Sequence, residues 1–286
     1  MQTFSKFIGI DWTGAKGKRH NGLAVAECEA GTGPPNLVAP PSGNKRWSRV
    51  ELTEWLAGLG SDDHVLVGID SSFAMPFVDA DGYFPNENAS RHAAQLWHSV
   101  AQVCGRDEDF YGGPFVDRYA RHYLRPGLRG DLYSRRMRVA ENLAVTSGVG
   151  PCESVFHLIG PSQVGLSGLS TMAILHELNQ QKHIAIWPFD EPGEASLVMV
   201  EIYAAAFASL GGHRGKIRDN VALENILQAF GVMEEFLSGA RFDDHQADAM
   251  VTAAALRHIA HDRKYWKPPA LSAMVRRTEG WIFGIV

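Results

Sequence analysis

The fold of this 286-residue chain is decided by two stretches, Lys6-Phe-Ile-Gly-Ile-Asp11 and His64-Val-Leu-Val-Gly-Ile-Asp70. Each is a run of apolar and β-branched residues that ends on an aspartate, which predicts a strand followed by a turn. The second run is almost continuously apolar, as in strands that are covered on both faces. We therefore expect two adjacent parallel strands that carry Asp11 and Asp70 at the same edge of a sheet.

The patterns outward from these strands predict an α/β protein with a mixed sheet flanked by helices. Asn21-Gly22 is a turn signal before an apolar run, so an antiparallel strand is expected beside the first strand. Ser48, with Glu51 three residues later, is typical of the start of a helix. Strands are expected at 6–11, 23–28, 37–38, 64–70, 183–187 and 196–203, and helices at 48–59 and 246–261.

Residues 85–180 interrupt this alternation. Breaks such as Gly112-Gly113-Pro114, Pro126-Gly127 and Gly160-Pro161 separate short helical stretches. We interpret the chain as a single domain, with a core of 1–84 and 181–286 and a largely helical insertion of 85–180.

Composition restricts the class of protein. Hydrophobic residues make up 45% of the chain, which is ordinary for a globular protein, and the net charge of −5 argues against a uniformly basic domain. The three cysteines have neither metal-site nor disulfide spacing, so a reducing compartment is expected. The first apolar run, 7–10, is too short for a signal peptide or a membrane span. We expect a cytoplasmic protein without membrane contact, and its oligomeric state stays open.

A third aspartate, Asp248, lies one turn inside the predicted helix 246–261. It follows Asp244 by four residues and His245 by three, so all three side chains project on one side. Clustered carboxylates need protons or a cation to neutralise them, and oxygen-rich sites favour Mg²⁺ or Mn²⁺. We predict that the catalytic residues are Asp11, Asp70, Asp248 and His245, and that the ligands of Mg²⁺ or Mn²⁺ are Asp11, Asp70, Asp248, Asp244 and Glu201.

Each of these residues also has a purely structural interpretation. The two strand-end aspartates can hydrogen-bond the turns that follow them, and the acids at 243–244 can cap the helix. His245 and Glu201 can be solvated side chains. Asp248 is the hardest to explain in this way, because it lies a full turn beyond the cap among small apolar residues.

Seven arginines lie between residues 118 and 138, interleaved with three tyrosines. Such a segment can grip phosphates and stack bases, or it can form ion pairs within the protein. The glycine-rich segment 211–216 can also cradle a phosphate, although it lacks the spacing of a P-loop. With nucleic acid as the candidate partner, we predict as substrate-binding residues Arg118, Arg121, Arg125, Arg135, Arg136 and Arg138.

Five short motifs occur in a recognisable order: Ile8-Gly-Ile-Asp-Trp-Thr-Gly14, Val67-Gly-Ile-Asp-Ser-Ser72, Val200-Glu-Ile-Tyr-Ala-Ala205, Asp243-Asp-His-Gln-Ala-Asp-Ala249 and Glu279-Gly-Trp-Ile282. Together they resemble domain-of-unknown-function family 429, which is regarded as a predicted nuclease of ribonuclease H-like fold. Similar acids in ribonuclease H and in Holliday-junction resolvases bind two divalent metals. The resemblance implies ligand roles for Asp11, Asp70 and Asp248, and places His245 at a resolvase-like helix position. Resolvases usually carry glutamate where this chain has Asp70.

The sequence thus predicts a ribonuclease H-like hydrolase, a divalent-metal-dependent nuclease or phosphodiesterase. An actin-like phosphotransferase is the second enzyme interpretation, although residues 11–14 match the phosphate loop of that class poorly. The non-enzyme alternative is a ribonuclease H-like nucleic-acid-binding or scaffold protein whose acids are structural.

Overall fold

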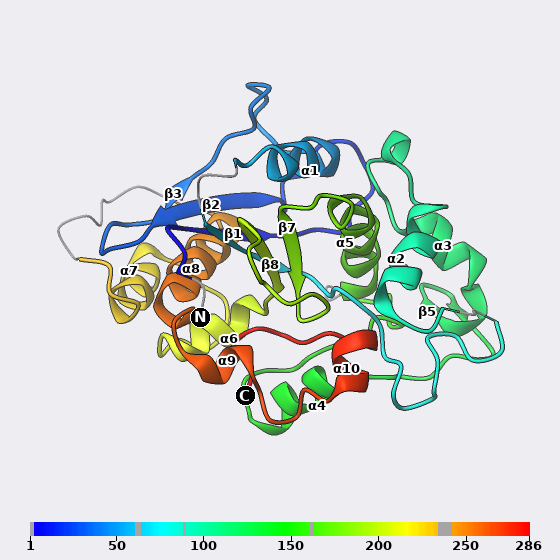
Figure 1. Ribbon diagram of the computed structural model, residues 1–286. Coiled ribbons are helices and arrows are strands. Elements are labelled where there is room, and N and C mark those ends of the chain that lie inside the picture. The colour runs from blue at the N-terminus through cyan, green and yellow to red at the C-terminus, as the bar shows by residue number, and fades with distance from the viewer. Residues whose placement is uncertain (1–2, 61–63, 88–89, 161–162, 234–241) are drawn as a thin grey trace.

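Six strands form one mixed sheet in the order β3-β2-β1-β4-β8-β7 (Figure 1). The computed structural model describes residues 3–60, 64–87, 90–160, 163–233 and 242–286. The strands of the sheet are β1 (Lys6–Asp11), β2 (Ala24–Glu29), β3 (Asn36–Leu37), β4 (Val65–Asp70), β7 (Ile184–Trp187) and β8 (Leu197–Glu201). β2 is antiparallel to β1 and β3, whereas β4, β8 and β7 run parallel to β1. The predicted α/β class, the antiparallel opening and the parallel pairing of β1 with β4 are therefore confirmed.

The pairing of β7 with β8 is parallel, although only residues 188–196 connect the two strands. Parallel neighbours usually need a longer crossover, and a short turn usually joins antiparallel strands. Because β7 has only four residues, the connection needs to run back along only a short strand before β8 begins. Nine connecting residues can reach ~30 Å when extended, which is more than enough to cross back.

Helices cover both faces of this sheet (Figure 1). On β1, Ile8 and Ile10 belong to the hydrophobic cluster that includes α5, whereas Phe7 belongs to the cluster that includes α8. None of the helices in the described ranges is long and apolar enough to cross a membrane. The helices are α1 (Arg49–Ala57), α2 (Ala93–Ala101), α3 (Gly113–Arg118), α4 (Val139–Thr146), α5 (Val164–Leu178), α6 (Ala204–Leu210), α7 (Asn220–Ala229), α8 (Asp244–Ile259), α9 (Arg263–Trp266) and α10 (Ala273–Thr278), with 3₁₀ turns at Arg106–Glu108 and Ala120–His122.

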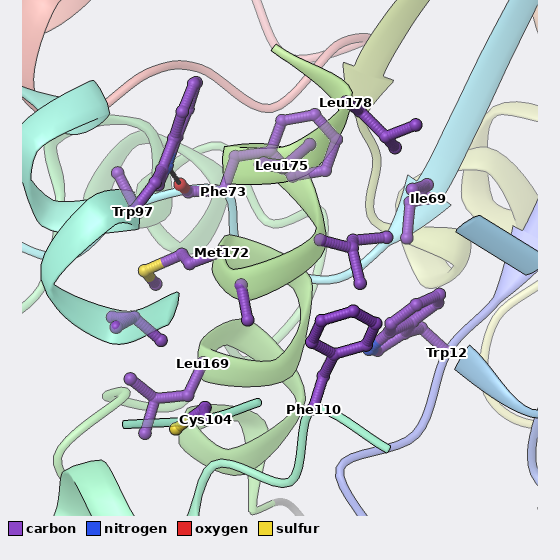
Figure 2. Packing of buried hydrophobic residues seen from close by; sticks show 14 of the residues in the cluster. Trp12, Ile69, Phe73, Trp97, Cys104, Phe110, Leu169, Met172, Leu175 and Leu178 are labelled. Atoms are coloured by element: carbon purple, nitrogen blue, oxygen red, sulfur yellow. Dashed lines mark hydrogen bonds between the residues drawn. The ribbon is translucent and has the colours of Figure 1, made fainter. Parts of the chain in front are cut away.

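The segment 85–180, which we expected to be an insertion, ends in a helix that belongs to the core. Figure 2 shows α5 with Trp12 and Ile69 on its sheet side and Trp97 of α2 on its other side. The Trp12 indole donates a hydrogen bond to Ser170 at 2.9 Å, which ties α5 to the end of β1. The part before α5 also packs on the core, through α2 and α4, and in the described ranges it adds the separate hairpin β5 (Leu124–Arg125) and β6 (Leu128–Arg129) but no strand to the six-stranded sheet.

Candidate active site

Asp11 and Asp70 are the last residues of β1 and β4, and the register of the two parallel strands places them directly opposite each other. Asp11 lies four residues after Phe7 on β1, and Asp70 lies four residues after Leu66 on β4. Phe7 and Leu66 both face α8. Successive side chains of a strand alternate between the faces, so both carboxylates lie on the α8 side of the sheet. The predicted convergence of these two residues is confirmed.

Helix α8 supplies the third carboxylate. Its N-terminus is fixed by Asp243, whose side chain accepts a hydrogen bond from the backbone N–H of Gln246 at 2.8 Å, while Gln246 returns the contact. One turn further, Asp248 reaches a cavity of about 580 Å³ that Asp11 and Asp70 also line. The structure therefore brings three of the predicted acids to one cavity.

His245 also lines this cavity and is bound to a strand-end acid. Its Nδ1 lies 2.6 Å from Asp11 Oδ2, and its side chain is 48% exposed while that of Asp11 is 10% exposed. The hydrogen bond that protonated His245 donates to Asp11, together with the charges of the nearby acids, raises the pKa of His245. Burial raises the pKa of Asp11, and the contact with His245 opposes that shift. The pair can hold and pass a proton at the edge of the cavity.

The surroundings of Asp70 and Asp248 disfavour the ionised form of both carboxylates. Burial, and then repulsion from Asp11 and Asp248, raises the pKa of Asp70 well above its ordinary value. Burial and the charge of Asp11 raise the pKa of Asp248 to about 7. Carboxylates that repel one another in this way are stabilised by a proton or by a cation between them.

The donor chemistry of the cavity suits a hard divalent ion, because carboxylate oxygens dominate it. Within the described ranges, however, no three histidine, cysteine, aspartate or glutamate side chains form a group that could hold a metal ion. In the side-chain positions seen here Asp11 is bound to His245 instead. The prediction of Mg²⁺ or Mn²⁺ thus stays a prediction.

Asp244 lies at the rim of the cavity and not at its centre. Its carboxylate is half exposed and lies 3.3 Å from the Nζ of Lys216. Lys216 is the last residue of the glycine-rich segment 211–216. A solvated ion pair of this kind has little net stability. The position fits a residue of the cavity entrance better than the predicted metal ligand.

The position of Glu201 does not fit the prediction that it is a metal ligand. It ends β8 with the parity of Leu197 and Met199, which face away from α8. Its carboxylate binds the guanidinium of Arg138 and also accepts the backbone N–H of Phe73 at 2.9 Å. Although Glu201 borders the cavity, its oxygens are already committed to protein donors.

The surroundings of Arg138 do not fit the prediction that it binds a substrate. It is 1% exposed, and its guanidinium binds both Glu201 and Glu141, the latter at 2.8 Å. It also donates to the carbonyl oxygen of Glu279 at 3.0 Å. Although Arg138, Glu141 and Glu201 border the cavity, this buried network joins α4, β8 and the C-terminal segment, so Arg138 is a structural residue.

The other arginines of the segment 118–138 are mostly paired with acids of the chain. Arg136 binds Asp79 and three backbone carbonyls, so it too is a structural residue. Arg118 lies over the ring of Tyr119 at 5.8 Å. The ion-pair alternative therefore describes much of this segment. The exposed or half-buried pairs are Arg121 with Asp131 and Glu87, Arg125 with Asp117, and Arg135 with Glu153.

One buried network near the site was missed from the sequence. Asp109 accepts hydrogen bonds from the backbone N–H groups of Arg49 and Val50, both at 3.0 Å, and contacts His20 Nε2 at 2.7 Å. The Arg49 guanidinium, which is fully buried, donates to the carbonyl of Thr13, two residues beyond Asp11. These residues are distant in sequence, so no local pattern indicates the network.

Comparison of the chain with protein-family models gave no match, and neither curated proteins nor solved structures gave a significant match.

Proposed function

We propose that this protein is a ribonuclease H-like hydrolase of phosphodiester bonds that uses the carboxylates of Asp11, Asp70 and Asp248 with a divalent cation. The observation that carries the proposal is the register of Asp11 opposite Asp70, with Asp248 of α8 at the same cavity. The strand order β3-β2-β1-β4, with β2 antiparallel, also supports the fold that the resemblance to family 429 implies.

The residues of the cavity have distinct tasks in this proposal. Asp11, Asp70 and Asp248 would hold the cation, and the chemistry that it would supply when bound is the activation of water and the stabilisation of a leaving oxygen. His245 is positioned by Asp11 and is open to solvent on its other side, so it can accept a proton from water. Arg138 and Glu201 border the cavity, and Glu201, which Arg138 binds, fixes the segment that follows Asp70 by accepting a hydrogen bond from the N–H of Phe73.

The experiment that tests this function combines metal binding with cleavage. We expect Mn²⁺ and Mg²⁺ to raise the melting temperature of the wild-type protein and to support cleavage of a fluorogenic oligonucleotide, in both cases abolished by EDTA. Asp248→Asn preserves shape but removes a charge, so it should reduce both effects. Asp107→Asn, at an exposed position in the turn Arg106–Glu108, is the matched control and should behave as wild type.

The outcomes separate the alternatives. Metal-induced stabilisation without cleavage of any phosphodiester would overturn the nuclease proposal and leave a metal-binding protein. No stabilisation in wild type, together with binding of oligonucleotides, would favour the non-catalytic scaffold. Equal shifts in wild type and Asp248→Asn would remove Asp248 from the site.

A further inference from the structure

A second cavity opens beside the first. It has a volume of about 490 Å³, and Gln163 and Leu166 line both cavities. This volume lies within the range of small-molecule sites. The shared wall makes the two cavities neighbouring parts of one surface depression at the start of α5.

The chemistry of the second cavity is that of a ligand site. Its floor includes the buried side chains of Val116 and Leu158, and the ring of Tyr111 forms part of its wall. Its charged lining is mixed: Arg125 is paired with Asp117, and Lys16 and Glu108 are the other charged residues. An apolar floor and an aromatic wall beside polar groups of defined position suit a ligand that is partly planar and apolar and partly charged.

Arg125 contributes a donor without an acceptor. Its Nη1 pairs with Asp117 at 2.7 Å, but its Nε is buried and has no hydrogen-bond partner. A buried N–H without an acceptor is costly, and most such groups in proteins are satisfied. Because this Nε has almost no accessible surface, an oxygen of a bound ligand satisfies it only when the Arg125 side chain turns toward the cavity.

Tyr111 is held rigidly in this wall. The two residues before it, Asp109 and Phe110, have left-handed backbone angles, with φ of 51° and 56°. Such angles persist in non-glycine residues only where the surroundings impose them, and here the contacts of Asp109 with Arg49 and His20 do so. Beneath the ring, a Cβ on Gly113 would lie 2.3 Å from Tyr111 Cε1.

The buried pair of Arg49 and Asp109 also positions Lys16. The Arg49 guanidinium donates to the carbonyl of Ala15 at 2.7 Å, directly before Lys16, whose Nζ lies 5.7 Å from the centre of the Tyr111 ring. Arg49 and Asp109 approach to 3.6 Å. One buried ion pair therefore fixes both the loop that follows Asp11 and the aromatic wall of the second cavity.

We propose that the second cavity binds one unpaired nucleotide of a single-stranded nucleic acid whose scissile phosphodiester lies at the carboxylates of the first cavity. The base stacks on the ring of Tyr111 and displaces the Lys16 ammonium that lies over it, and phosphate oxygens contact Lys16 Nζ and the guanidinium of Arg125, which turns toward the ligand. This inference rests on the proposed function and adds the class of substrate, because stacking on Tyr111 requires a base that is free of its partner strand.

The test measures binding separately from cleavage. Fluorescence anisotropy in EDTA, with a labelled 12-nucleotide single strand, should show that Tyr111→Leu weakens binding about 10-fold. Tyr111→Phe keeps the ring and should bind as wild type. Lys16→Ala should weaken binding and lower its salt dependence by about one phosphate contact. The matched control is Tyr133→Leu, which removes a tyrosine outside both cavities that contacts Arg129.

Three results would overturn the proposal in distinguishable ways. Wild-type affinity in Tyr111→Leu, with cleavage still lost in Asp248→Asn, would reject the nucleotide subsite and leave the phosphodiesterase function standing. Binding of a 12-base-pair duplex as tightly as the single strand would reject the substrate class. Absence of both binding and cleavage in the wild-type protein would reject the subsite and the proposed function together.

Discussion

Gly9 lies opposite Gly68 in the parallel pairing of β1 with β4, and α8 crosses both residues. A Cβ on Gly9 would lie 2.2 Å from the carbonyl oxygen of Ala249, and one on Gly68 would lie 2.9 Å from Leu256 Cδ1. The two missing side chains let α8 approach the sheet closely. This contact places Asp248 over the strand ends that carry Asp11 and Asp70.

Gly9→Ala should therefore destabilise the protein and weaken metal binding. The methyl group would meet backbone atoms of Ala249 and Ala253, which cannot rotate away, so we expect a loss of about 3 kcal/mol or more in urea denaturation. Gly33→Ala is the control, because nothing lies within 4 Å of a Cβ there. Similar losses in the two variants would contradict the close approach of α8.

Asp248→Asn should change how stability depends on pH. The folded protein holds a proton on Asp248 up to about pH 7, whereas the unfolded chain releases it near the ordinary value of 3.8. Between these pH values the folded state binds more protons, so stability falls as pH rises, by up to about 4 kcal/mol.

The measurement is urea denaturation at pH 5 and pH 8 in EDTA. Asp248→Asn should lose less stability across this interval than wild type and should be the more stable protein at pH 8. Asp107→Asn should keep the wild-type dependence. A wild-type slope in Asp248→Asn would show that burial and the charge of Asp11 do not raise the pKa of this carboxylate.

The contact between His245 and Asp11 should be visible in the titration of the imidazole. Because the carboxylate stabilises the imidazolium, we expect an NMR pKa for His245 above 6.5 that falls in Asp11→Asn. The stabilisation from this pair is present below the ordinary histidine pKa while Asp11 is ionised, and it is lost as pH rises through the raised pKa of His245. The resonances of His176, on α5, should not change between the two proteins, and an unchanged His245 would contradict the contact.

Much of the sheet could be predicted because its signals are local. The apolar runs before Asp11 and Asp70 define β1 and β4, and the caps at Ser48 and Asp243 define the starts of α1 and α8. The role of α5 could not be predicted in this way. It is buried on most of its surface, and its sequence includes Gly165 and Gly168, so it shows no apolar stripe that would mark it as a core helix.

The site was predictable to the same extent. Asp11, Asp70 and Asp248 follow from strand ends and helix spacing, which are properties of short segments. The orientation of the Glu201 side chain could not be predicted. Since β8 is buried on both faces, its sequence shows no alternation of apolar and polar residues that would indicate which face the last side chain takes. Its partner Arg138 is 63 residues away in sequence, and only the tertiary fold shows that the two meet.

Arg138→Met should test whether this arginine is structural or binds a substrate. Removal of the guanidinium leaves Glu141 and Glu201 as buried carboxylates without their cation, which typically costs about 3–5 kcal/mol. Arg135→Ala breaks only an exposed pair with Glu153 and should cost less than about 1 kcal/mol. Glu201→Gln combined with Arg138→Met should recover part of the loss, because one unpaired charge is removed. If Arg138→Met instead kept wild-type stability and weakened oligonucleotide binding, the arginine would have to reach the substrate, and the buried network bordering the cavity would be wrong.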